Sequence, residues 1–255
     1  MRTLLAHQLA ADLRVFWRDP AAVGFTVALP LIFLVLFVSI FGNTETVVDG
    51  RTVEGATYYV PGILSLSIAS AAFVNLAISV TIARERGILK RARATPIPPW
   101  AFMAGRVGAA VSVSIGLTVV VALFGAVLYG VELPGSTLIG AIVAVLLGSA
   151  TFAALGLAVT AVLPSENSAA PVTNVIVLPL YFISGIFVPA EQLPEIMRTI
   201  ADLFPVKPLF DALLEAFTPT TTGLGLAWAD LAVLAAWGSA GAGIAAQFFR
   251  WSPRG

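Results

Sequence analysis

The stretch AAVGFTVALPLIFLVLFVSIFG, residues 21–42, contains no charged side chain. An α-helix rises about 1.5 Å per residue, so a run of this length covers the roughly 30 Å hydrocarbon core of a bilayer. A cleaved signal peptide has a shorter apolar segment that leads into a small-residue cleavage site. We therefore expect this run to form a membrane-spanning helix that is retained.

The rest of the chain repeats this pattern. Of the 255 residues, 58% are hydrophobic and 11% are charged, and the mean hydropathy is +0.95. Soluble domains contain about 25% charged residues. Further apolar runs of spanning length occupy residues 57–83, 107–131, 135–163, 168–189 and 227–249. The sequence thus predicts an all-α integral membrane protein with six transmembrane helices in a single domain, residues 1–255.

Basic residues indicate how these helices cross the membrane. With both termini on one side, that side carries 11 of the 14 Lys and Arg residues. By the positive-inside rule, both termini then face the cytoplasm. We expect a multi-pass protein of the cell membrane, inner or plasma.

Shorter elements are expected between the spans. Within residues 1–20, Leu5, Leu9 and Leu13 share one helical face, which predicts an amphipathic helix along the inner membrane surface. The Asp49-Gly50 pair predicts a turn, or a small hairpin, in the loop 43–56. The segment 190–224 predicts two short amphipathic helices, either re-entrant or lying externally at the interface.

Several kinds of chemistry are disfavoured by the residues present. The chain has no cysteine and one histidine, His7, so it offers neither thiolate ligands nor a histidine cluster for a metal. The predicted spans carry ionisable residues only near their ends, at Glu132 and Asp230, which disfavours a proton-coupled antiporter. Neither lysine follows a glycine, so the chain lacks a phosphate-binding loop. We expect no catalytic residues, metal or cofactor in this chain.

The charged segment 84–104 is the polar exception. A short charged helical turn, Arg84 to Arg93, is followed by TPIPPW, residues 95–100, where the prolines prevent a continued helix. Its simplest interpretation is a positively charged topology anchor. That role alone does not require the Glu85-Arg86-Gly87 turn.

Two motifs resemble a known family. ARERGILKRARATPIPPWAFMAGRV, residues 83–107, is similar to a loop of ATP-binding-cassette (ABC) exporter permeases of the type-2 membrane family, particularly the daunorubicin-resistance-like branch. There a Glu-Arg-Gly turn precedes Thr-Pro and a Gly-Lys/Arg start to the next span. SGIFVPAEQLPEIMRTIADLFPVKPLFDAL, residues 184–213, resembles the same family's prolines before its last span. With the six spans and the N-terminal helix, the resemblance covers nearly the whole chain.

The resemblance implies partners and roles for particular residues. It implies a homodimer, or a heterodimer with a homologous permease, that is surrounded by membrane lipid and binds cytoplasmic ABC ATPase subunits, which hold the ATP and Mg. It implies ATPase coupling at Glu85, Arg86, Gly87, Lys90, Arg91, Arg93 and Pro96. It implies a translocation pathway along Phe73, Asn75, Asn174, Tyr181 and Phe182. It implies an external gate at Pro189, Pro205 and Phe210.

Two interpretations of function follow. The first is the permease subunit of an ATP-driven exporter that moves an amphipathic drug, antibiotic or lipid-like substrate outward. The alternative is a membrane-integral enzyme or scaffold without transport, for which Asp211 and Glu215 are the adjacent external carboxylates. The intramembrane Asn75 and Asn174 fit a substrate contact, or hydrogen bonds between helices.

Overall fold

The computed structural model describes residues 2–42, 45–48, 51–93, 99–189, 192–221, 223–249 and 251. The helices are α1 (Arg2–Trp17), α2 (Pro20–Phe41), α3 (Gly55–Ala69), α4 (Leu76–Glu85), α5 (Ile88–Arg93), α6 (Pro99–Tyr129), α7 (Leu138–Val159), α8 (Glu166–Ile183), α9 (Glu195–Leu203), α10 (Val206–Phe217) and α11 (Trp228–Phe248). A π-helical turn, η1 (Ser70–Asn75), joins α3 to α4. Strands β1 (Glu45–Val48) and β2 (Arg51–Glu54) form an antiparallel hairpin.

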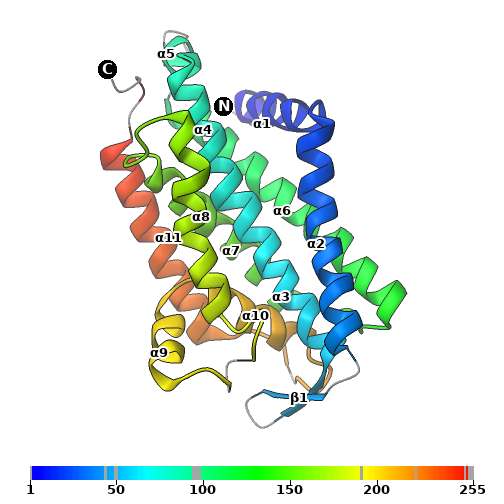
Figure 1. Cartoon of the computed structure of the whole chain (residues 1–255). Coiled ribbons are helices and arrows are strands. Elements are labelled where there is room, and N and C mark those ends of the chain that lie inside the picture. The colour runs from blue at the N-terminus through cyan, green and yellow to red at the C-terminus, as the bar shows by residue number, and fades with distance from the viewer. Residues whose placement is uncertain are drawn as a thin grey trace.

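The long helices form one bundle with different elements at its two ends (Figure 1). Helix α1 lies crosswise to α2 at one end, where α5 also projects and where α11 finishes. The hairpin, α9 and α10 lie at the opposite end. The two strands confirm the predicted hairpin, whereas its Asp49-Gly50 turn lies outside the described residues.

Five helical stretches of the described chain are long and apolar enough to cross a membrane. They are Val23–Phe41, Gly55–Glu85, Ala101–Tyr129, Leu138–Val159 and Trp228–Phe248. The structure is thus mainly helical, as predicted, and these stretches provide candidate membrane-spanning helices for five of the six predicted spans. A sixth span over residues 168–189 is not confirmed, because α8 has 18 residues, begins with the polar Glu166, Asn167 and Ser168, and ends at Ile183.

Two helix boundaries differ from the expectation in a way that changes the charged segment. The helical stretch made of α3, η1 and α4 continues through Arg84 to Glu85, so these two residues belong to the helix rather than to the loop. Helix α6 begins at Pro99, which places Arg106 inside it. Proline is tolerated at a first helical position because its missing N–H needs no partner there. Pro99, the last of the three prolines predicted to interrupt the helix, therefore starts the next one.

The core lies around α3, whose residues are all buried. Helix α10 packs against α3, α7 and α11, and it buries Leu209, Phe210 and Leu213. Glycine permits the close approach to α7, because a Cβ at Gly148 would lie 2.5 Å from the Leu209 side chain. By contrast, α2, α6, α7 and α11 expose many large apolar side chains, as helices that face lipid do.

Candidate functional site

The corner between α4 and α5 is built on Gly87. Its φ of +68° is a left-handed conformation, and its N–H donates to the Arg84 carbonyl over 3.0 Å. Glycine adopts this conformation without a Cβ penalty and so ends a helix readily. Helix α5 follows at once, and its Leu89 is fully buried. The short helix is thus anchored to the bundle by one apolar side chain.

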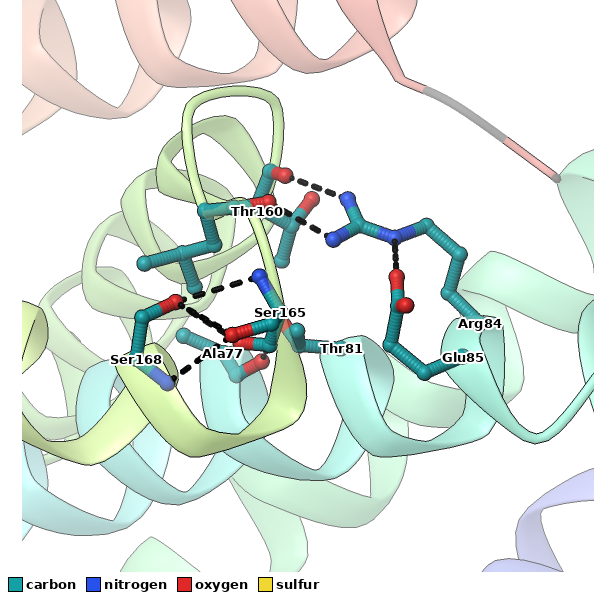
Figure 2. Close-up of polar contacts among 8 residues, drawn as sticks. Ala77, Thr81, Arg84, Glu85, Thr160, Ser165 and Ser168 are labelled. Atoms are coloured by element: carbon teal, nitrogen blue, oxygen red, sulfur yellow. Dashed lines mark hydrogen bonds and ion pairs between the residues drawn. The ribbon is translucent and has the colours of Figure 1, made fainter. Parts of the chain in front are cut away.

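Arg84 is the largest fully buried side chain of the described chain, with 1% of its surface exposed. Its two terminal nitrogens donate to the carbonyls of Thr160 and Leu163 over 2.8 and 2.7 Å. Its Nε donates to Glu85 over 3.1 Å (Figure 2). The accepting carbonyls belong to the turn that follows α7. A cation is favourable at a helix C-terminus, where carbonyls lack intrahelical partners.

A second contact joins the same elements on the surface. The Arg86 Nε lies 3.3 Å from the Glu166 carboxylate at the start of α8. Helix α8 is capped there by Ser165, whose side chain accepts from the Ser168 N–H while the Ser168 hydroxyl accepts from the Ser165 N–H (Figure 2). Glu85 and Arg86, predicted to contact an ATPase, therefore also bind residues of this chain.

The other predicted coupling residues lie on α5 or beyond it. Lys90 and Arg91 are exposed at this end of the bundle. Arg93 is the last residue of α5, but its side chain lies outside the described part, as does Pro96. The structure thus places a basic helix surface next to Gly87. Binding of an ATPase there stays a prediction.

Helix α1 is docked on α6 near this corner. Gln8 packs against Gly105, and the Asp12 carboxylate lies 3.5 Å from the Arg106 Nε. Burial raises the pKa of Asp12, although Arg106 and a hydrogen bond from Gln8 act to lower it. Leu9 and Leu13 are half-buried, which agrees with the predicted apolar face. The amphipathic helix is therefore packed on the bundle along one face.

Two of the predicted pathway residues are buried inside this chain. Phe73 belongs to the π-helical turn η1, and Tyr181 of α8 lies beside that turn. The Tyr181 and Ser70 hydroxyls are 3.1 Å apart, and Tyr181 also donates to the Leu66 carbonyl over 3.4 Å. A π-turn leaves the regular helical hydrogen-bond pattern, and such turns often occur at functional sites. Tyr181 stabilises this irregular turn.

The remaining pathway residues face outward. Asn75, Asn174 and Phe182 are exposed on η1 and α8, which contact each other and lie on the viewer's side in Figure 1. Polar amides exposed on a helix surface that is otherwise apolar are suited to a protein or substrate contact. These three residues are exposed, whereas Phe73 and Tyr181 are buried.

The predicted gate residues lie at the end opposite α5. Phe210 is buried and packs edge-to-face on Tyr58, with ring centroids 5.2 Å apart. Pro205 is buried at the start of α10, and Pro189 is half-buried before it. The Tyr58 hydroxyl donates to the Gly185 carbonyl. Phe210 is therefore a packing residue between α10 and α3, and a gating role stays a prediction.

Sequence reasoning missed Arg84, Leu89 and Lys207. Lys207 lies 2.8 Å from Asp202 and 2.6 Å from Asp211, and so ties α9 to α10. A weak signal for Arg84 was present, since an arginine at the end of an apolar span needs either water or polar partners for its guanidinium. Among the described residues, no group of three or more His, Cys, Asp or Glu side chains could hold a metal ion.

Fold and site together define a helical membrane protein. At one end of its bundle, the corner between α4 and α5 carries basic side chains and lies beside the capped start of α8. The chain belongs to the ABC-2 type transporter family, whose pattern matches residues 4–218. It is 31% identical over 221 residues to the daunorubicin resistance ABC transporter permease protein DrrB1 of Streptomyces coeruleorubidus, covering 80% of this chain and 74% of the relative. It is 25% identical over 203 residues to YvfS of Bacillus subtilis (strain 168), covering 79% and 80%.

The inner membrane transport permease YadH of Escherichia coli (strain K12) is 24% identical over 183 residues, 71% of each chain. The chain is accordingly a membrane permease of the ABC-2 family. DrrB1 is named as an ABC transporter permease, and YvfS and YadH are named as transport permeases. Membership in this family implies association with ABC ATPase subunits.

Proposed function

We propose that this chain is the membrane-spanning subunit of an ATP-driven exporter that moves an amphipathic drug, antibiotic or lipid-like substrate outward. Separate cytoplasmic ATPase subunits bind ATP and Mg²⁺ and supply the free energy. The observation that carries the proposal is α5, a short helix that presents Lys90 and Arg91 at the end of the bundle where α1 lies. The family membership supports an ATPase as the protein that binds there.

The membrane arrangement follows from the same polarity. In the proposed orientation, α1 and α5 lie on the cytoplasmic side of the cell membrane, and the hairpin, α9 and α10 lie outside. Helix α8 serves as the sixth crossing, since its 18 residues reach about 27 Å at 1.5 Å per residue. It runs alongside α4 in the bundle (Figure 1).

The substrate path is proposed to lie between two permease subunits, identical or homologous. The exposed surface of η1 and α8 supports this, because Asn75, Asn174 and Phe182 there combine amides with an aromatic ring. Such a surface suits a substrate with both polar and apolar parts better than a bare ion. The name of DrrB1 as a daunorubicin resistance permease supports the same substrate class.

The test is purification of the tagged chain from its native membrane with its associated proteins. We expect an ABC ATPase to co-purify, and we expect the double variant Lys90→Glu/Arg91→Glu to lose most of it through charge reversal on α5. Arg198→Glu, on exposed α9 at the other end, is the matched control and retains the ATPase. Recovery of the wild-type chain without any ATPase under gentle extraction contradicts the proposal.

A further inference from the structure

Because the Arg84 side chain is buried, its guanidinium needs its three hydrogen-bond acceptors. A guanidinium withdrawn from water is stable only when it is paired and hydrogen-bonded. Arg84 meets this condition with Glu85 of its own helix and with the carbonyls of Thr160 and Leu163. The two carbonyls come from a segment more than 70 residues away in the chain. Arg84 therefore binds α4 directly to the α7–α8 turn.

The same turn is held to α4 by apolar packing. Ala77 of α4, Leu163 of the turn and Ala169 of α8 form a small fully buried cluster, separate from the main core. The Arg86–Glu166 ion pair adds a contact on the surface. Figure 2 shows Arg84 reaching from its helix to this turn, above the cap of α8. These contacts make α4, the turn and the start of α8 one unit at the end that carries α5.

This unit is separated from the rest of the second span by the π-helical turn η1. Beyond η1, α3 packs on α10 and α6, and its Tyr58 donates to Gly185. A π-turn interrupts the regular hydrogen-bond pattern and is a place where a helix can bend. Displacement of α5 thus has a short path to α8 through the Arg84 contacts, while η1, residues 70–75, marks the boundary between this unit and α3.

We propose that Arg84 is a positioning residue that makes the α7–α8 turn and α8 follow the movement of α5 when the ATPase subunits close. This inference rests on the proposed exporter function. Arg84 does not contact the ATPase or the substrate, since it is buried inside the chain. Its loss uncouples ATP hydrolysis from transport without removing the ATPase.

The experiment places a fluorescent probe on the turn. This chain has no cysteine, so Val162→Cys, at a position 64% exposed, is its single labelling site, and the chain is labelled before the ATPase is added back. The purified complex, reconstituted in sealed proteoliposomes, is compared with and without MgATP and vanadate. Four labelled proteins are compared: the parent chain with Arg84 intact, Arg84→Met, Arg84→Lys and the control Arg198→Met. Co-purified ATPase, hydrolysis rate and daunorubicin transported per ATP hydrolysed, with daunorubicin as the probe substrate, are measured on the same proteoliposomes.

With Arg84, we expect a nucleotide-dependent change of the probe signal. With Arg84→Met, the ATPase still co-purifies and hydrolyses ATP, the probe change falls at least fivefold, and transport per ATP falls at least tenfold. Arg84→Lys retains part of the donor set and gives intermediate values. Arg198→Met matches the parent. A purely structural role would instead lower assembly and hydrolysis together.

A full probe change and full transport per ATP in an assembled Arg84→Met complex overturn the inference. If Arg84→Met does not assemble with the ATPase, the Arg84→Lys complex tests the inference instead. A probe change equal to the parent's at an equal hydrolysis rate then overturns the inference, and a smaller probe change supports it. If no ATPase co-purifies with the parent chain, the proposed function is refuted, and this inference with it. That result differs from every result that overturns the inference alone, because those all require an assembled complex.

Discussion

At the scale of single residues, charged side chains in this chain make polar contacts across element boundaries. Arg84 binds the turn after α7, Asp12 approaches Arg106, and Lys207 bridges α9 and α10. Exposed ion pairs contribute little to stability, whereas burial makes a lost partner costly. The effect of substituting a charged residue should therefore depend on its burial more than on its place in a basic motif.

Lys207→Met tests this at the end opposite α5. Burial by itself lowers the pKa of Lys207, but Asp211 and Asp202 raise it above the ordinary 10.5. A raised lysine pKa gives a stabilisation that is fully present below 10.5 and is lost only as pH rises through the folded value. We expect Lys207→Met to lower the free energy of unfolding by about 1 kcal/mol and so to lower the unfolding temperature. This loss of stability should be constant over roughly pH 6 to 9.

Thermal unfolding of the detergent-solubilised chain at several pH values measures this difference. Arg198→Met, on exposed α9, is the comparison and should unfold like the parent. A difference for Lys207→Met that disappears between neutral pH and pH 9 would argue against the stated pairing.

At the scale of elements, close backbone contacts depend on glycine where helices cross. A Cβ built on Gly156 of α7 would lie 2.9 Å from the Phe73 carbonyl oxygen and 3.0 Å from that of Ala72. Both oxygens belong to the π-helical turn, and backbone atoms move less readily than side-chain ends. The irregular turn and the glycine on α7 are therefore complementary.

Gly156→Ala should destabilise the protein, since overpacking against backbone costs about 1–3 kcal/mol. Gly116→Ala on α6 is the matched control, because nothing lies within 4 Å of its added Cβ. That control should be neutral, or stabilising by up to about 1 kcal/mol through helix propensity. Unfolding temperatures of both variants measure the difference, and equal values would show that α7 can move away from η1.

At the scale of the whole molecule, the two ends of the bundle differ in kind. One end carries α1, α5 and the basic corner, and the other carries the hairpin, α9 and α10 (Figure 1). The positive-inside rule predicts that the basic end faces the cytoplasm. This orientation stays a prediction.

Single cysteines test this orientation, because the parent chain has none. In intact cells, a membrane-impermeant maleimide should label Glu45→Cys in the hairpin. It should label Asn167→Cys, at the start of α8, only after permeabilisation. Both positions are exposed. Labelling of Asn167→Cys in intact cells, with Glu45→Cys protected, would reverse the proposed topology.

Much of the fold was predictable because it depends on local properties of the chain. Apolar runs predicted five spans, and helical periodicity predicted α9 and α10 before the structure placed them. Errors arose where a helix end was predicted from the first charged residue. Arg84 was expected to start the loop, but it lies inside α4, where its side chain is buried. The predicted span at 168–189 was too long, since the helix stops at Ile183.

The sequence by itself determined a helical membrane protein, its polarity and its family motifs, because hydrophobic length and charge act on each segment separately. Only the tertiary structure decided which residues meet. It placed Asn75 outward and Phe73 inward on the same turn, and it brought Arg84 to carbonyls more than 70 residues away. Such pairings depend on how helices pack, and packing depends on the whole bundle rather than on any one segment.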